Sequence, residues 1–529
     1  MLSCPQPASF RYNLGSPEER NMKHLPAVIT LLLCLAPITS RAEAEPKVLR
    51  EVWYESRAEG GKLGCMHLRA EEVDRAGRKL IRTTLRDEMS YLRSGDPYSD
   101  AQEQETLETP TGEVVELSYS VTLSKKQRLR IRGEVKGREL HLCVLDDQGK
   151  PTEFTQVVPW DPLALGLYAQ EAFFEKHPAR PGETVVIKGF NVYANRVLAM
   201  TYRVLAKEAT QVGMEKQELL RVEASYPRDA YLTPTTMWLD SSGRVVKMQE
   251  DDSTLFGSMT RVLTSKEVAT AEFKPTVRDK EAPVLVNKPI NIRRGRPSSL
   301  RVRVSLAGDD DPGTLFAEDG RQRILAADNE AVELRLLARQ PTIPVPVQVL
   351  LLGAPAAAGE EYLQSNFFIR SDDPLVRKLA NEALGQNGEN KEPREKARLI
   401  KRWVRTKVRG NYEIPFATAD EVARSLEGDC SEMGMLAAAM ARAVGIPSRV
   451  AFGLVYDAEN KGFGGHLWTE VFLDGQWQPL DATGVLDLLN AAYIRIASYS
   501  MKDVLNPDEL VEVRRAFTGE MKVEVVEAR

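Results

Sequence analysis

Cysteine and histidine are scarce in this sequence, since its 529 residues contain only five of each. An excess of one sign of charge is also lacking, because 71 basic residues face 76 acidic ones and leave a net charge of −5. This balance argues against a nucleic-acid partner, because binding driven by counterion release needs a basic surface. The sequence does contain 43% apolar and 28% charged residues. Over this length, such a composition predicts a multidomain protein with packed cores.

Long apolar runs are absent apart from one near the start, His24–Ser40. Lys23 precedes this run and the small residues of Ala42–Ala44 follow it, which is the order of a secretory signal peptide whose natural start would be Met22. About 16 apolar residues interrupted by two prolines are fewer than the ~20 that cross a bilayer. We therefore expect residues 1–44 to be a signal segment with an over-extended start. A secreted or periplasmic protein with no membrane span would remain after its removal.

Removal of that segment leaves three cysteines, Cys65, Cys143 and Cys430. In an oxidising compartment, three cysteines are most simply arranged as one disulfide and one free thiol. Cys65 and Cys143 both fall on expected strands of one β-rich region, so the sequence predicts a Cys65–Cys143 disulfide. The alternative is two separate buried thiols that pack as small apolar residues. In the first arrangement, Cys430 is the free thiol.

The pattern of the chain changes at three places. Residues 47–276 alternate apolar and polar positions between turn residues, which is typical of antiparallel strands with one solvated face. A second, shorter β-rich segment is expected over residues 277–358. From residue 361 to 529 the pattern becomes that of amphipathic helices mixed with strands. The sequence therefore predicts an antiparallel β-rich N-terminal part followed by an α+β domain.

The α+β part contains a cysteine in a position that favours reactivity. Cys430 follows Gly428 and Asp429 and opens an Ala- and Met-rich run that ends at Gly445, which predicts a helix with the thiol at its N-terminal end. Backbone N–H groups and the helix dipole favour a thiolate there, and the thiolate is the nucleophilic form of cysteine. The alternative is a cysteine that only fills the core beside an Ala-rich helix.

A histidine and an aspartate follow on a predicted β-hairpin. If Leu473 pairs with Gln476 across an Asp474-Gly475 turn, His466 and Asp481 become diagonal neighbours on one face. Asp481 would then orient the imidazole and stabilise its protonated form. The alternatives are a structural histidine and an aspartate that caps a turn. One cysteine and one histidine give too few soft ligands for zinc, so neither a metal nor a cofactor is expected.

A resemblance to the core of the transglutaminase-like superfamily lies in two stretches, GDCSEMGMLAAAMARAVGIPSRVAFGLVY and GGHLWTEVFLDGQWQPLDAT. Members of this superfamily place a Cys, a His and an Asp in that order, and the similarity extends over roughly Tyr362–Ser500. The resemblance implies a papain-like helix packed on an antiparallel sheet. It also implies that Cys430 is the nucleophile, His466 the general base and then acid, and Asp481 the orienting carboxylate.

Two functions from different classes follow from these patterns. The first is an exported cysteine-dependent enzyme that acts on amide or peptide carbonyls through an acyl-enzyme. It would be a protease or amidase, or would transfer the acyl group of protein glutamine to an amine, and its substrate would be a peptide or protein such as one of the cell envelope. Hydrolysis is preferred because nothing in the sequence marks an amine-acceptor site. The alternative is a non-catalytic envelope protein that binds a ligand through its long β-rich part and carries a degenerate transglutaminase-like domain.

Overall fold

The computed structural model describes most of the chain from Pro46 to Arg529. The expected signal segment, residues 1–44, lies outside the described residues. The described ranges are 46–58, 61–93, 96–123, 127–146, 148–253, 257–275, 284–292, 297–338, 358–411, 417–483, 490–502, 511–518 and 521–529.

A 14-stranded antiparallel sheet is built from the first half of the described chain. Strands next to each other in this sheet are also consecutive in the sequence, except that β1 pairs with both β2 and β14. The sheet is therefore two meanders joined at its first strand. The strands are β1 (Lys47–Ala58), β2 (Gly61–Arg75), β3 (Arg78–Arg93), β4 (Asp96–Glu108), β5 (Val114–Leu123), β6 (Gln127–Lys136), β7 (Glu139–Leu145), β8 (Pro151–Pro159), β9 (Thr184–Asn191), β10 (Arg196–Val212), β11 (Glu215–Ser225), β12 (Thr235–Leu239), β13 (Val245–Ser253) and β14 (Gly257–Thr264).

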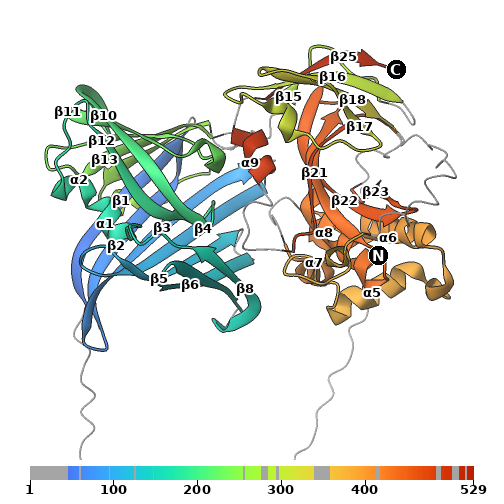
Figure 1. Cartoon of the computed structure of the whole chain (residues 1–529), viewed down its shortest axis with the longest axis horizontal. Coiled ribbons are helices and arrows are strands. Elements are labelled where there is room, and N and C mark those ends of the chain that lie inside the picture. Colours follow the sequence, from blue (N-terminus) through green and yellow to red (C-terminus); the bar gives the residue numbers. More distant parts are fainter. Residues whose placement is uncertain are drawn as a thin grey trace, which may run out of the picture. The chain divides into compact units, whose positions relative to one another are not determined.

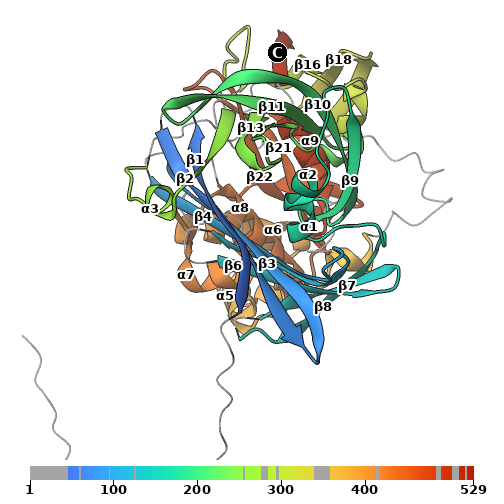
Figure 2. The same cartoon turned by 90° about the vertical axis from the view of Figure 1, so that its left-hand side faces the viewer.

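This sheet curls around a short helix, α1 (Leu167–Glu171). The helix contacts β3, β4 and β9, which stand at distant places in the strand order, and Figure 2 shows the strands curving around it. The start of α1 is held by the buried Glu108 of β4, whose Oε1 accepts a hydrogen bond from the backbone N–H of Ala169 at 2.9 Å. The expected antiparallel β-rich N-terminal part is confirmed.

The predicted disulfide between Cys65 and Cys143 is wrong, because both cysteines are free thiols. Cys65 lies on β2 and Cys143 on β7, with four strands of the sheet between them. Neighbouring strands are about 4.8 Å apart, so the two residues are separated by roughly 24 Å along the sheet. A disulfide needs Cα atoms about 5.5–6 Å apart. The sequence placed both cysteines on strands of one sheet but contained no information on strand order.

Two smaller sheets form the core of the second half of the chain. One has the order β15-β22-β21-β24, with β23 paired to β22, and the other has the order β17-β18-β16-β25. Because β25 comes from the end of the chain and pairs with β16, the two ends of this half meet in one sheet. The strands are β15 (Val284–Leu285), β16 (Ser299–Leu306), β17 (Gln322–Ala327), β18 (Ala331–Leu337), β21 (Ser448–Asp457), β22 (Gly462–Leu473), β23 (Gln476–Leu480), β24 (Tyr493–Tyr499) and β25 (Met521–Ala528).

Helix α8 is the central helix of this half. The α-helices of this half are α5 (Pro374–Leu384), α6 (Pro393–Lys407), α7 (Ala419–Ser425), α8 (Cys430–Ala443) and α9 (Val511–Thr518) among the described residues. Helices α5, α6 and α7 all contact α8, which itself packs against β21 and β22. The predicted α+β domain is therefore confirmed. Among the helices of the described residues, none is long and apolar enough to cross a membrane.

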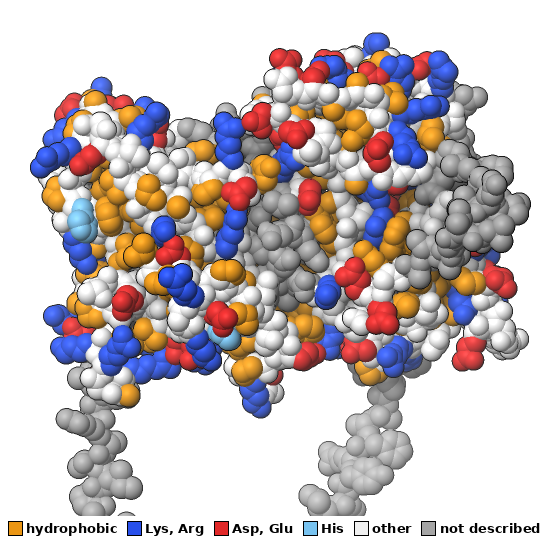
Figure 3. Space-filling model, viewed as in Figure 1, with side chains coloured by type: hydrophobic (Ala, Val, Ile, Leu, Met, Phe, Trp, Pro, Cys, Tyr) orange, Lys and Arg blue, Asp and Glu red, His pale blue; other side chains and the backbone are white. Residues whose placement is uncertain are grey.

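Strand β21 connects two hydrophobic cores. Its residues Val450 and Phe452 pack with the helices, whereas Leu454 and Tyr456 on the same face pack with the sheet of β16 and β18. Figure 1 shows β21 and β22 running from the helices to that sheet. The segment that contains β16–β18 thus packs directly on the strands that carry the predicted site. Figure 3 shows basic and acidic side chains interspersed over the visible face, in keeping with the balanced composition.

A close approach of backbones in this sheet gives a stability prediction. A Cβ atom on Gly453 of β21 would lie 2.0 Å from the carbonyl oxygen of Ile494 on β24. We expect Gly453→Ala to lower the free energy of unfolding by about 1–3 kcal/mol, because the backbone of β24 must move. The matched control is Gly464→Ala on the paired strand β22, where nothing lies within 4 Å of the added methyl. Equal losses in the two variants, measured by urea denaturation, would contradict this account.

Candidate active site

The predicted helix start at Cys430 is confirmed, since this residue is the first of α8. Asp429 caps the helix by accepting a hydrogen bond from the backbone N–H of Ser431 at 2.9 Å. In return, Oε2 of Glu432 accepts from the backbone N–H of Asp429 at 2.9 Å, which completes a capping box. The sequence expectation did not include this box, although the spacing of Asp429 and Glu432 is its usual signal. The cap fixes where the helix begins and leaves Cys430 half-buried.

Glu432 is a buried carboxyl two residues after the thiol. It is 0% exposed, and its Oε1 accepts a second backbone hydrogen bond from Ala417 at 2.9 Å. Burial, followed by the negative charge of Asp429, raises the pKa of Glu432 well above its ordinary value. Glu432 therefore remains neutral to a higher pH than an ordinary glutamate. Its raised pKa favours the neutral form, which disfavours a second negative charge beside Asp429 at the place where a thiolate would form.

The start of a helix is not sufficient by itself to ionise a thiol at neutral pH. A helix N-terminus stabilises a negative charge by about 0.3–1 kcal/mol at an exposed position, whereas one pKa unit corresponds to about 1.4 kcal/mol. A free cysteine has a pKa of about 8.5, so a neutral-pH thiolate needs a further positive group. The imidazole of His466 is the candidate source of that charge.

The hairpin that carries His466 has the predicted register, with Leu473 opposite Gln476 across the turn. Strand β23 ends one residue before Asp481. Nε2 of His466 lies 3.1 Å from Oδ2 of Asp481, so the predicted meeting of these two side chains is confirmed. His466 is 8% exposed and Asp481 is 0% exposed. With Nε2 facing the carboxylate, Nδ1 is the ring nitrogen that remains for other chemistry.

Asp481 receives hydrogen bonds from three parts of the chain. Besides His466, the backbone N–H and the hydroxyl of Thr483 donate to its Oδ1 at 2.9 and 2.7 Å. The hydroxyl of Tyr493 donates to its Oδ2 at 3.0 Å. Burial by itself would raise the pKa of Asp481, but the hydrogen bonds and charge from His466 and the donors of Thr483 outweigh burial and lower it. The buried carboxyl is therefore held in its ionised form.

Two of these partners were not anticipated from the sequence. Thr483 had a local signal, because an aspartate two residues before a threonine commonly forms a turn of this kind. The turn-capping alternative for Asp481 thus describes one of its contacts, and His466 the other. Tyr493 lies 12 residues beyond Asp481 on β24, a strand outside the hairpin. No local pattern marks such a long-range contact.

The helix that begins at Cys430 packs on the strand that carries His466. The hydroxyl of Thr469 on β22 donates to the backbone carbonyl of Gly434 on α8 at 2.8 Å. Gly434 lies one helical turn after Cys430, and Thr469 lies three residues after His466. A Cβ on Gly434 would lie 2.4 Å from a terminal methyl of Leu467, so a larger residue here would require the Leu467 side chain to move. The fold thus places all three predicted residues in one substructure, with a direct contact between His466 and Asp481.

Comparison with known proteins gives one family match. Residues 378–482 match the transglutaminase-like superfamily. This range includes Cys430, His466 and Asp481. A search of curated proteins finds no match.

Several solved structures are similar at low identity. A candidate cysteine protease from Cytophaga hutchinsonii is 16% identical and covers 44% of this chain and 86% of its own, with a TM-score of 0.28. A β-barrel-like protein of unknown function from Brucella abortus is 15% identical and covers 42% of this chain and 98% of its own, with a TM-score of 0.30. A candidate protease from Parabacteroides distasonis is 14% identical and covers 73% and 68%, with a TM-score of 0.20. At these values, the match of residues 378–482 is the comparison that bears on function.

The lowered pKa of Asp481 gives a prediction on stability and pH. An aspartate with a lowered folded-state pKa contributes stability above its unfolded pKa of about 4, and this contribution is lost as pH falls through the folded-state pKa. We expect Asp481→Asn to lower the free energy of unfolding at pH 7 by about 1–3 kcal/mol. The difference from the wild type should narrow as pH falls below about 4. Chemical denaturation at a series of pH values measures both effects.

The matched control for this variant is Asp474→Asn at the tip of the same hairpin. Asp474 is exposed and has a left-handed backbone (φ 53°), which asparagine also adopts readily. We expect this control to change stability little at any pH. A loss in Asp481→Asn that stays constant down to pH 2 would contradict the assignment of an ionised, hydrogen-bonded Asp481.

Proposed function

Because residues 378–482 are a transglutaminase-like domain, we propose that this protein is a cysteine-dependent enzyme that acts on amide or peptide carbonyls. Cys430 is the proposed nucleophile, His466 the proton carrier and Asp481 the group that orients the imidazole. The observation that carries the proposal is the buried contact between His466 and Asp481. The strand that holds His466, β22, is also the strand against which the Cys430 helix packs. A buried ionised carboxylate is costly, and a structural histidine does not require one.

The first half of the proposed reaction forms a thioester. Asp481 accepts from Nε2–H of His466, which makes Nδ1 the basic nitrogen of the neutral ring. Nδ1 takes the proton of the Cys430 thiol, and the sulfur attacks the carbonyl carbon of the substrate. The backbone N–H of Cys430, in the first turn of α8, is the proposed donor to the resulting oxyanion. Nδ1–H then protonates the departing amine, and the acyl group remains on sulfur.

The second half of the reaction returns the enzyme to its starting state. For hydrolysis, Nδ1 takes a proton from water, and the oxygen attacks the thioester carbonyl. The carbon–sulfur bond breaks, the acid product leaves and the thiol recovers its proton. An amine in place of water would give acyl transfer instead. We favour hydrolysis of an extracytoplasmic peptide or protein, because the expected signal segment predicts export and no feature of the sequence marks an amine-acceptor site.

The reactivity of Cys430 tests this proposal without a known substrate. Iodoacetamide labelling near pH 7, followed by peptide mapping, should modify Cys430 at least about ten times faster than a model thiol, because only thiolate reacts and a partner cation lowers its pKa. The chain contains its own controls in Cys65 and Cys143, which are half-buried and outside any disulfide. Burial raises the pKa of Cys65, so this thiol should react slowly.

A variant links the labelling rate to the histidine. His466→Ala should slow the modification of Cys430 several-fold at pH 7 and leave Cys65 and Cys143 unchanged. The proposal fails if Cys430 reacts no faster than the other two thiols, or if His466→Ala has no effect on its rate.

Trapping the thioester tests the reaction itself. Wild-type protein incubated with a mixture of cell-envelope peptides and quenched in acid should show an added acyl mass on the tryptic peptide that contains Cys430. Cys430→Ala should show no such adduct under the same conditions. An unmodified Cys430 peptide across several classes of peptide and amide would argue against an acyl-enzyme.

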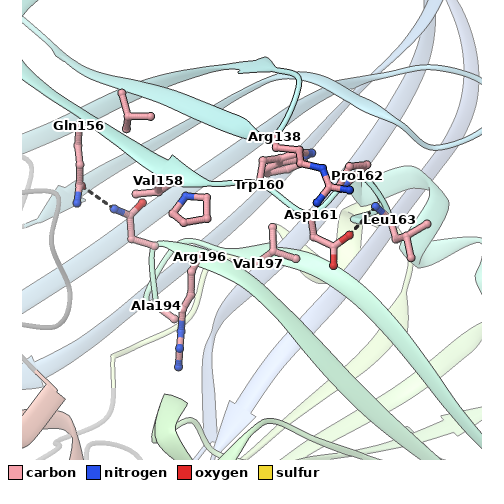
Figure 4. A pocket seen from close by; sticks show the side chains of 13 residues that line it. Arg138, Gln156, Val158, Trp160, Asp161, Pro162, Leu163, Ala194, Arg196 and Val197 are labelled. Carbon is pink, nitrogen blue, oxygen red and sulfur yellow. Dashed lines mark hydrogen bonds between the residues drawn. The ribbon is translucent and has the colours of Figure 1, made fainter.

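A cavity in the first half of the chain favours the second candidate function, ligand binding by the β-rich part. The cavity has a volume of about 930 Å³, within the range of small-molecule sites. It is lined by β8, β10 and the residues that follow β8, and Figure 4 shows Gln156 at one end and Arg138, Trp160 and Asp161 at the other. The side-chain amide of Asn195 donates a hydrogen bond to Oε1 of Gln156 at 3.0 Å. A full-length Cys430→Ala chain that restores the phenotype of a deletion strain would favour this binding function over catalysis.

A further inference from the structure

Two donors share one oxygen of the buried carboxylate. Oδ2 of Asp481 lies 3.1 Å from Nε2 of His466 and 3.0 Å from the hydroxyl of Tyr493. Tyr493 is the first residue of β24 and is 5% exposed. Its ring also lies beside those of His466 and Trp468, with centroids 6.3 and 5.5 Å away. The hydroxyl thus meets Asp481 from a strand that belongs neither to the hairpin nor to the Cys430 helix.

We propose that Tyr493 is a positioning residue of the site, whose hydroxyl holds Oδ2 of Asp481 against His466. This inference rests on the proposed function for its catalytic meaning, but the geometry that carries it involves only Tyr493, Asp481 and His466. Tyr493 acts through Asp481 and does not itself reach the reacting thiol in this account.

The donors other than Tyr493 leave one oxygen of the Asp481 carboxylate free to move. Both hydrogen bonds from Thr483 go to Oδ1, so they fix one oxygen and allow the other to swing about it. A hydrogen bond from Tyr493 to Oδ2 removes this freedom. The phenol is itself fixed, because Tyr493 pairs with Val455 in the sheet and its ring packs edge-on against Trp468. A rigid donor of this kind keeps the carboxylate in the orientation that His466 needs.

Charged groups on neighbouring elements also face this region. Asp319 and Arg321 before β17, Glu470 on β22 and Arg495 on β24 line a small cavity of about 20 Å³ together with Trp468 and Tyr493. Arg495 pairs with both acids, at 3.0 Å from Asp319 and 3.5 Å from Glu470. Arg321 is held by backbone carbonyls, donating to those of Leu337 at 3.0 Å and Asn490 at 3.3 Å. Because all four charged groups have partners of their own, we expect them to stay in place when the hydroxyl of Tyr493 is removed.

The scarcity of histidine allows a direct experiment on the full-length chain. After the expected signal segment only four histidines remain, at positions 67, 141, 177 and 466, so ¹³C-histidine labelling gives four ring signals to titrate by NMR. His466→Gln identifies the signal of His466. In Tyr493→Phe, we expect the titration midpoint of this signal to fall by about half a pH unit or more, because a mobile carboxylate stabilises the imidazolium less. Labelling of Cys430 at pH 7 should slow several-fold in the same variant.

The matched control is Tyr456→Phe on the adjacent strand β21. Tyr456 is 1% exposed, and its hydroxyl accepts a hydrogen bond from the backbone N–H of Ile290 at 2.9 Å, away from Asp481. Its loss should lower stability without moving the His466 signal. The double variant Asp481→Asn with Tyr493→Phe should titrate like Asp481→Asn alone, because Tyr493 acts through Asp481.

The outcomes separate this inference from the proposed function. An unchanged midpoint in Tyr493→Phe overturns the inference. A raised midpoint also overturns it, because the hydroxyl would then only disperse the charge of Asp481. A lowered midpoint together with an unreactive Cys430 in the wild type would support the positioning contact and reject the enzyme.

Discussion

A carboxylate buried from water must find its hydrogen bonds within the protein, and Asp481 finds four of them from three separate parts of the chain. The hairpin supplies His466, the following turn supplies Thr483 and β24 supplies Tyr493. Each of these elements must be in register for the charge to be tolerated at 0% exposure. The ionised form of Asp481 therefore links the geometry of the site to the correct folding of three neighbouring segments.

The rest of the second half of the chain supports this arrangement. Strand β21 lies between β22, which carries His466, and β24, which carries Tyr493. Its glycine at position 453 allows the backbone of β24 to come close. The segment before the helical region also contributes, because Gln322 exchanges two hydrogen bonds with the backbone of Arg495 on β24, at 2.7 and 2.9 Å. The β-rich segment that contains β16–β18 thus acts as a support for β24.

Local patterns in the sequence predicted the parts of the site that depend on local physics. The start of α8 at Cys430 follows from an Ala-rich run after an Asp, and the contact between His466 and Asp481 follows from a two-residue turn and the alternation of strands. Features that depend on long-range order were not predictable in this way. The Cys65–Cys143 disulfide failed because strand order within a 14-stranded sheet leaves no trace in the period of its strands. Tyr493 was not found for the same reason, since its partner lies on another strand.

The electrostatics of the thiol itself show why Asp481 is the centre of the site. The start of α8 alone stabilises a thiolate by less than the equivalent of about one pKa unit, and the carboxylate of Asp429 opposes it. The raised pKa of Glu432 disfavours a second opposing charge but adds no attraction. A substantial stabilisation of the thiolate must then come from another group, and the imidazole of His466, held by Asp481, is the proposed one. In the proposed enzyme, reactivity at Cys430 would therefore depend on a carboxylate 51 positions later in the sequence. That carboxylate in turn depends on the donors that keep it ionised in a buried place.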